Sequence, residues 1–214
     1  PKTLNIALAG TGVGKSLFMC HVASSVISQG KNVLYITLEM AEERIAERID
    51  ANLLDVTIDD LYEMPKEIYD NKTSKMQNKT NGQLIIKEYP TASAHAGHFK
   101  SLLDELALKK AFKPDLIFID YLNICTSSRF KGGNINSYTM VKSIAEELRG
   151  LAVQYNVPIV SATQTTRTGY LSSDVGLEDT SESFGLPATA DFMFALISND
   201  ELEELGQIKV KQLK

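Results

Sequence analysis

The sequence has 214 residues, of which 43% are hydrophobic, and this suits one α/β domain of ordinary size. The formal net charge of −5 argues against a protein that coats nucleic acid through overall positive charge, so any contact with nucleic acid must be local. Cys20 and Cys125 favour reduced thiols in a cytosolic protein, and the sequence has no signal peptide and no apolar run long enough to span a bilayer.

A glycine-rich loop follows the first predicted strand, residues 4–9. It precedes a predicted helix over 15–29 that Gly30 ends, and this is the context that a phosphate-binding P-loop requires. Glycines let backbone N–H groups turn towards phosphates, and the helix N-terminus adds partial positive charge. Lys15 is predicted to reach the β- and γ-phosphates of a nucleotide, and the Ser16 hydroxyl to hold Mg²⁺. The predicted nucleotide-binding residues are Ala9, Gly10, Thr11, Gly12, Val13, Gly14, Lys15, Ser16 and Leu17.

The first position of this loop departs from the usual pattern. Ala9 stands where a P-loop has its first glycine. Alanine is small enough for that position provided that its φ is negative.

Strand and helix signals alternate along the rest of the chain, as in a mostly parallel sheet flanked by helices. We expect further strands over residues 32–38, 84–88, 116–120, 157–163, 191–198 and 207–213. We expect further helices over 41–53, 97–112 and 139–155, with a short helix and a longer one between 57 and 81. Residues 126–138 and 165–187 have the composition of loops, and a loop as long as the second is usually functional.

Several predicted strands end on polar side chains, and ligands bind at the carboxyl ends of strands in an open parallel sheet. Asp120 follows four hydrophobic residues, a pattern typical of a Walker B carboxylate that holds Mg²⁺ through water; the alternative is a capping or loop aspartate. Glu39 is suited to orient and deprotonate an attacking water, a role compatible with capping the next helix. Gln164 both donates and accepts hydrogen bonds, which suits a sensor of the γ-phosphate.

Together these segments resemble the RecA-like motor domain of DnaB-like replicative helicases, most closely those of large tailed phages. The family has an Ala-led P-loop and segments of the form Ser-Leu-Glu-Met, Ile-Asp-Tyr-Leu-Gln and Val-Pro-Val-Val…Ser-Gln-Leu-Asn-Arg. The matching residues here are 9–16, 37–40, 119–123 and 157–167. The resemblance runs from residue 4 to about residue 211 and implies an α/β fold with a RecA-like P-loop NTPase core. We expect residues 1–214 to form a single domain of a longer protein, because the chain begins at Pro1 without Met and ends in a strand-like run.

The resemblance also implies an assembly and partners. It implies a homo-hexameric ring that hydrolyses Mg-ATP between subunits and holds single-stranded DNA in its central channel. It further implies a primase and a helicase loader as partners, no membrane, and a location in the cytoplasm of a bacterium or of a phage-infected host.

Residue roles follow from the same resemblance. It makes Glu39 the catalytic base, with Lys15 and Gln164 as further catalytic residues. Arg48 falls where the family has an arginine near the nucleotide; a surface charge paired with Glu47 or Asp50 is the alternative. The expected DNA-binding residues lie in the two long loops: Arg129, Lys131, Gly132, Gly133, Arg167, Ser183, Phe184 and Gly185. The second loop is acidic overall, so we expect it to contact phosphates through backbone N–H groups.

Two positions depart from the family pattern. Ser181 stands where the family has an arginine in the second loop. The run 209–214, where the family supplies an arginine finger to its neighbour, holds lysines and no arginine, so we expect the finger beyond Lys214. His95 and His98 are spaced i, i+3, and we expect them to lie on the surface or cap a helix rather than bind metal.

Two other classes of protein share parts of this pattern. A RecA-type recombinase shares the core and would form a filament rather than a ring on DNA. A nucleotide-dependent regulatory module would bind ATP with little hydrolysis. A small-molecule kinase is disfavoured because no segment has the character of a lid over an acceptor site.

Overall fold

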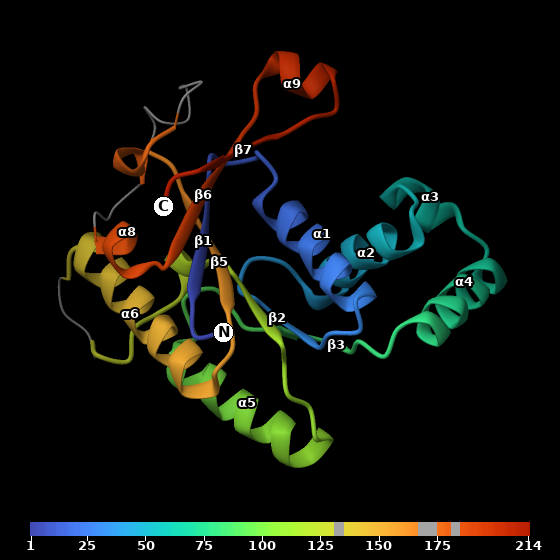
Figure 1. The fold of residues 1–214 in the computed structure, drawn as a ribbon, viewed down its shortest axis with the longest axis horizontal. Helices are drawn as coiled ribbons and strands as arrows, with labels where there is room; N and C mark the ends of the chain where they lie inside the picture. Colours follow the sequence, from blue (N-terminus) through green and yellow to red (C-terminus); the bar gives the residue numbers. More distant parts are fainter. Residues whose placement is uncertain (131–134, 167–174, 181–184) are drawn as a thin grey trace.

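The computed structural model describes residues 1–130, 135–166, 175–180 and 185–214 (Figure 1). Within these residues a seven-stranded sheet forms the middle layer, in the order β3-β2-β4-β5-β1-β6-β7. Neighbouring strands are parallel except at the β6–β7 edge, which is antiparallel. The predicted α/β class with a mostly parallel sheet is therefore confirmed. The strands are β1 (Leu4–Ala9), β2 (Val33–Thr37), β3 (Leu84–Glu88), β4 (Leu116–Asp120), β5 (Ile159–Gln164), β6 (Phe192–Ile197) and β7 (Lys209–Gln212).

Helices cover both faces of the sheet, and alternating strand residues serve the two faces. On one face Ile6 joins a core cluster with Phe99 of α5 (Ala96–Lys110) and Leu148 of α6 (Ser137–Tyr155). On the other face Ala7 joins a cluster with Met19 of α1 (Lys15–Ser28). Strands buried on both faces read as continuous apolar runs, which is why β1 and β4 could be recognised in the sequence. The helices are α1 (Lys15–Ser28), α2 (Glu42–Leu54), α3 (Ile58–Glu63), α4 (Lys66–Lys79), α5 (Ala96–Lys110), α6 (Ser137–Tyr155), α8 (Gly185–Thr189) and α9 (Asp200–Glu204), with short 3₁₀ turns η1 (Leu122–Ile124) and η2 (Leu177–Asp179).

Most predicted element boundaries lie close to the observed ones. The strands predicted over 4–9, 84–88 and 116–120 have the observed bounds. The helix predicted over 15–29 ends at Ser28, and Gly30 follows with a φ of 78°, a left-handed conformation that glycine adopts without strain. The predicted loop over 165–187 is wrong in part, because η2 and the start of α8 lie within it.

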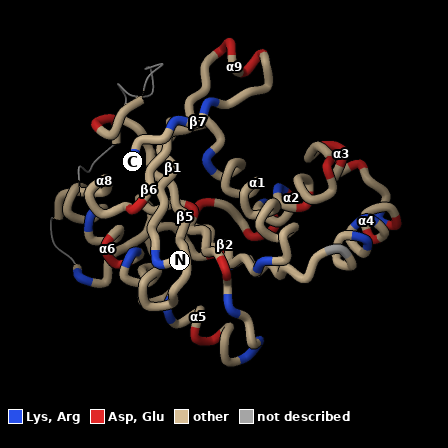
Figure 2. Tube along the Cα trace, in the orientation of Figure 1, with Lys and Arg blue, Asp and Glu red and all other residues tan. Residues whose placement is uncertain are grey.

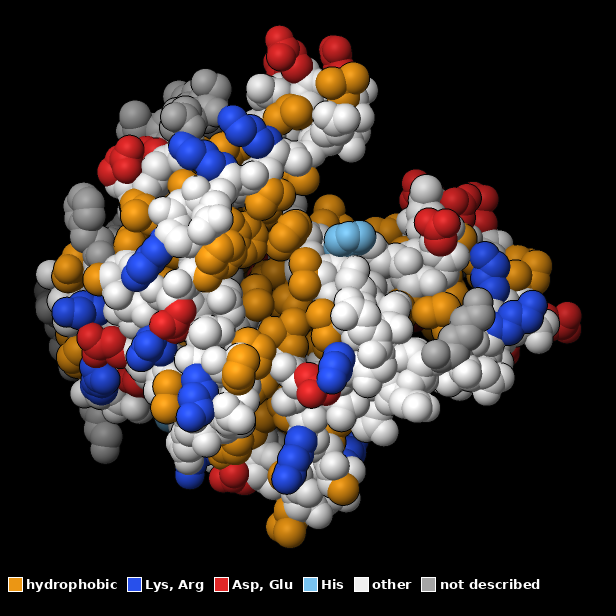
Figure 3. All heavy atoms as spheres, in the orientation of Figure 1, with side chains coloured by type: hydrophobic (Ala, Val, Ile, Leu, Met, Phe, Trp, Pro, Cys, Tyr) orange, Lys and Arg blue, Asp and Glu red, His pale blue; other side chains and the backbone are white. Residues whose placement is uncertain are grey.

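Charged and hydrophobic side chains are unevenly distributed over the surface. Acidic residues gather on α3 and α9 in Figure 2. Hydrophobic side chains gather in a hollow between β6 and α1 in Figure 3. Phe18 of α1 and Phe194 of β6 pack with ring centroids 5.4 Å apart, and Phe192 is exposed. In the described part of the chain we find no helix with the length and apolar character needed to cross a membrane.

Candidate nucleotide-binding site

The loop between β1 and α1 has the backbone shape that its glycines predict. Gly12 and Gly14 have φ values of 81° and 103°, which other residues rarely adopt. A side chain at Gly12 would meet open space, so the backbone angle and not crowding requires glycine there. Ala9 is the last residue of β1 and has no positive φ, so an alanine fits this position. Gly14 is the N-cap of α1 and offers no capping side chain, which leaves backbone N–H groups of the first turn available to an anion.

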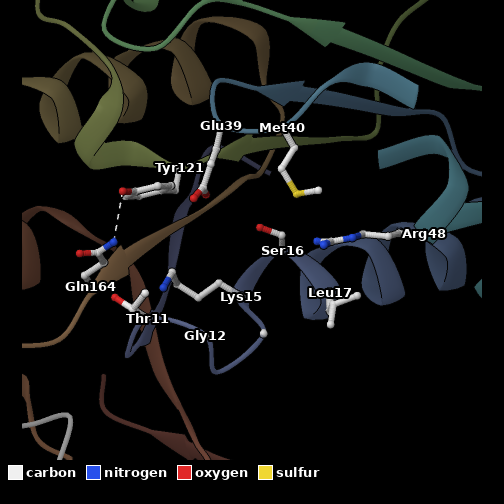
Figure 4. A pocket seen from close by; sticks show the side chains of 11 residues that line it. Thr11, Gly12, Lys15, Ser16, Leu17, Glu39, Met40, Arg48, Tyr121 and Gln164 are labelled. Carbon is white, nitrogen blue, oxygen red and sulfur yellow. Dashed lines mark hydrogen bonds between the residues drawn. The ribbon is translucent and has the colours of Figure 1, made fainter. Parts of the chain in front are cut away.

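A cavity of about 250 Å³ lies over this loop (Figure 4). The ends of β1, β2, β4 and β5 contribute its walls, as expected for the carboxyl edge of a parallel sheet. It brings together Lys15, Ser16, Glu39, Arg48 and Gln164, which the sequence predicted as site residues. The full lining is Thr11, Gly12, Gly14, Lys15, Ser16, Leu17, Glu39, Met40, Arg48, Tyr121 and Gln164.

Lys15 points into the cavity from the first turn of α1 (Figure 4). Its Nζ donates to the backbone oxygens of Gly10 at 3.0 Å and Ala9 at 3.4 Å. Burial lowers the pKa of Lys15, and the carboxylates of Glu39 and Asp120 oppose this effect. The amine is therefore held over its own loop by carbonyl groups, in a position where phosphate oxygens can compete for it.

Asp120 ends β4 with a carboxylate that is fully buried. The Tyr35 hydroxyl donates to Asp120 Oδ2 at 3.0 Å, whereas Oδ1 has no hydrogen-bond partner among the described residues. Burial raises the pKa of Asp120, and the hydroxyls of Ser16 and Tyr35 oppose this rise. A buried carboxylate oxygen without a partner is costly, so it fits a site that a divalent cation completes.

Glu39 follows β2, is exposed, and reaches the cavity beside Met40 (Figure 4). The alternative role of Glu39, as a cap of the next helix, is not found, because Ala41 is the N-cap residue of α2. Thr37 instead fixes this turn, since its Oγ1 accepts a hydrogen bond from the Met40 N–H at 3.1 Å and donates to the Met40 oxygen at 2.7 Å. The Glu39 carboxylate thus stands at the mouth of the cavity while another side chain holds the turn.

Arg48 extends from α2 towards Ser16 (Figure 4). Among the described residues, the alternative pairing of Arg48 with Glu47 or Asp50 is not found. Glu47 accepts hydrogen bonds from Arg44 and Tyr62, and Asp50 accepts one from Tyr69 at 2.7 Å. The orientation of Arg48 therefore favours a contact with bound nucleotide.

Gln164 ends β5 directly beside Ala9 of the P-loop strand. Its Nε2 donates to the Tyr121 hydroxyl at 3.2 Å, and the dashed line in Figure 4 marks this bond. Tyr121 was not predicted as a site residue, although it directly follows Asp120 at a strand end. Met40 was missed in the same way, although it directly follows Glu39.

Few of the predicted DNA-binding residues lie in the described part of the chain. Arg129 forms an ion pair with Glu146 and lies 4.0 Å from Glu147, both on α6. Gly185 is buried at the start of α8, and a Cβ built there would lie 2.9 Å from the Lys142 side chain. The residues predicted at positions 131–133, 167, 183 and 184 lie outside the described residues: Lys131, Gly132, Gly133, Arg167, Ser183 and Phe184.

The two neighbouring histidines cap a helix, as predicted. His95 is the N-cap residue of α5, and its Nδ1 accepts from the Gly97 N–H at 3.0 Å. The Nδ1 of His98 accepts from the His95 N–H at 3.2 Å. Among the described residues no cluster of three or more histidine, cysteine or acidic side chains could hold a metal ion.

The sequence has known relatives among replication proteins. Residues 1–210 match the family described as DnaB-like helicase C terminal domain. The chain is 50% identical to the DnaB-like replicative helicase of Enterobacteria phage T4 over 99% of its length, which is 45% of the T4 protein. It is 24% identical to the replicative DNA helicase DnaB of Helicobacter pylori over 91% of the chain and 39% of that protein. The chain therefore spans less than half the length of these relatives.

Solved structures share the fold. The ATPase domain of a phage helicase superposes with a TM-score of 0.79 over all of this chain and 77% of that one, at 18% identity. A DnaB-like replicative helicase, solved in a study of its interactions with primase, gives a TM-score of 0.75 over 95% of this chain and 49% of that one, at 19% identity. At these identities the likeness establishes the fold alone, which is the RecA-like architecture.

Proposed function

Because the chain belongs to the family of DnaB-like helicase C-terminal domains, we propose that it is the ATP-hydrolysing motor of a hexameric replicative DNA helicase. In this proposal the whole protein translocates on single-stranded DNA and unwinds duplex. One observation carries it: Lys15, Glu39 and Gln164, from three separate segments, line the same cavity at the carboxyl ends of parallel strands.

The residues that line the cavity would have separate roles in ATP hydrolysis. Lys15 and the N–H groups at the start of α1 would neutralise the β- and γ-phosphates. Glu39 would accept a proton from a water molecule as its oxygen attacks the γ-phosphorus, while the bond to the bridging oxygen breaks and ADP departs with the electron pair. Gln164 would register the γ-phosphate and, through its bond to Tyr121, link that state to β4.

We propose Mg²⁺ as the partner of the nucleotide at this site, where Ser16 lines the cavity and Asp120 directly precedes the lining residue Tyr121. Ser16 and Asp120 would hold it, since a hydroxyl and a carboxylate are ligands that Mg²⁺ prefers. The Asp120 Oδ1 atom, buried and without a partner in the described residues, supports this assignment. When bound, the cation would supply charge neutralisation across the phosphates.

The proposal also covers DNA binding, the hexameric ring and the further protein partners. With a net charge of −5, one copy offers little bulk attraction for DNA. Six copies around one strand would present the same local cations repeatedly and bind multivalently. We assign this DNA contact to residues of both long loops. They are Arg129, Lys131, Gly132 and Gly133 in the first loop and Arg167, Ser183, Phe184 and Gly185 in the second. The primase, the loader and a cytoplasmic location belong to the proposal as well.

DNA-stimulated ATP hydrolysis tests the proposal most directly. The protein would be prepared at the length of its T4 relative, and its ATPase rate measured with and without single-stranded DNA. We expect stimulation by DNA and rings in electron micrographs. Filaments on DNA would instead favour a RecA-type recombinase, and binding of ATP without single-turnover hydrolysis would favour a regulatory module.

A further inference from the structure

Tyr35 is a fully buried tyrosine on β2, next to the strand that carries Asp120. In the parallel pairing of β2 with β4, Tyr35 stands opposite Phe118 and Thr37 opposite Asp120. Side chains two residues apart on a strand share a face, so Tyr35, Phe118 and Asp120 lie on the same side of the sheet. The Tyr35 ring stacks on Phe118 with centroids 5.4 Å apart and an interplanar angle of 20°. This packing fixes the direction of the phenol.

The hydroxyl of Tyr35 has one partner on each side. It donates to Asp120 Oδ2 at 3.0 Å, and the Cys20 thiol of α1 lies 3.9 Å away as a donor to it. Both the phenol and the thiol are buried. A phenol has a single proton to donate. Because the thiol occupies an acceptor position, that proton goes to Asp120.

The two oxygens of Asp120 are therefore in different situations. Oδ2 is held by Tyr35, and Oδ1 is buried without a partner among the described residues. From this asymmetry we infer that Tyr35 is a positioning residue, whose hydroxyl fixes the Asp120 carboxylate so that Oδ1 is left for the divalent cation that accompanies the nucleotide. The inference rests on the proposed function, because it requires a nucleotide-bound cation beside Ser16. Hydrogen bonds from such outer residues commonly change metal affinity by about 10–100-fold.

Tyr35→Phe tests this role, since it removes the hydroxyl and keeps the stacked ring. Binding of a fluorescent ATP analogue to the 214-residue chain would be measured at fixed pH, first in EDTA and then along a Mg²⁺ titration. Tyr69→Phe is the matched control, because it removes a hydroxyl bonded at 2.7 Å to another carboxylate, Asp50, outside the cavity. Thermal unfolding of each variant would verify that the fold is kept.

We expect Tyr35→Phe to raise the Mg²⁺ concentration for half-maximal binding by about tenfold and to leave binding in EDTA unchanged. Tyr69→Phe should match the parent chain. In an Asp120→Asn background Tyr35→Phe should add little, because the two residues act as one unit. A parental Mg²⁺ response in Tyr35→Phe, or an equal shift in the Asp120→Asn background, would overturn the inference.

The same experiment separates this inference from the proposed function. Lys15→Ala should weaken binding both in EDTA and in Mg²⁺, and Asp120→Asn should weaken it in Mg²⁺. If both variants bind like the parent, the nucleotide site itself is misassigned and the inference falls with it. If both lose affinity while Tyr35→Phe binds like the parent, only the inference is overturned.

Discussion

Lys15→Ala should weaken binding of ATP by removing the one cation of the P-loop. The amine is half-buried and at present donates to the Gly10 and Ala9 oxygens at 3.0 and 3.4 Å. Two unit charges about 4 Å apart attract by about 4 kcal/mol at an effective dielectric constant of about 20. Part of this attraction replaces the hydrogen bonds to those oxygens, so the net loss should be about 1.5–3 kcal/mol, as for other bonds to charged groups. This corresponds to a dissociation constant raised by about 10–150-fold.

Titration with a fluorescent ATP analogue measures this change. Lys109→Ala is a suitable control, because it removes the same charge from an exposed ion pair with Glu105 on α5. Burial lowers the pKa of Lys15, so the parent should lose affinity on the alkaline side at a lower pH than an ordinary lysine would allow. Lys15→Ala should lack that alkaline loss. Equal dissociation constants for the parent and Lys15→Ala would refute the P-loop assignment.

Three further perturbations address the chemistry, the stability and the DNA contact. Glu39→Gln should leave ATP binding nearly intact and slow turnover by about 10²–10⁴-fold in the assembled ring; a parental rate would mean that another residue activates the water. Asp120→Asn should raise the thermal midpoint of the chain without nucleotide at neutral pH. The reason is that burial raises the pKa of Asp120 in the folded state above its unfolded-state value. The stabilisation from the protonated carboxyl is fully present below the unfolded-state pKa and is lost as pH rises through the folded-state pKa. At neutral pH the ionised carboxylate therefore destabilises the fold, and asparagine removes that charge. The gain should vanish in acid, and a gain that does not change with pH would contradict this account. Arg129→Ala combined with Lys131→Ala should weaken binding of single-stranded DNA to the ring and flatten its salt dependence; a parental salt slope would exclude this loop from phosphate contact.

Local features of the fold could be predicted from the sequence because they depend on near neighbours. The buried strand that ends in Asp120 is a continuous apolar run, and the turn at Gly12 and Gly14 needs the φ values that glycine tolerates. That Lys15, Glu39 and Gln164 meet could also be predicted, because the carboxyl ends of parallel strands share one edge. Contacts between side chains of distant elements could not be predicted in this way. The sequence reveals no acidic partner for Arg129 in its own loop, yet α6 brings Glu146 to it.

The Tyr35–Asp120 hydrogen bond is also a contact between distant segments, and the local sequence does not reveal it. Each residue alone looks ordinary: one is an apolar position in a strand and the other a carboxylate at a strand end. Their contact depends on the β2–β4 register, and a shift of one residue would turn the Tyr35 side chain to the opposite face. Register is fixed by burial on both faces of the sheet, a property of the whole core. The residues that contact phosphate could thus be predicted from local motifs, whereas the residue that orients the Asp120 carboxylate is specified by packing.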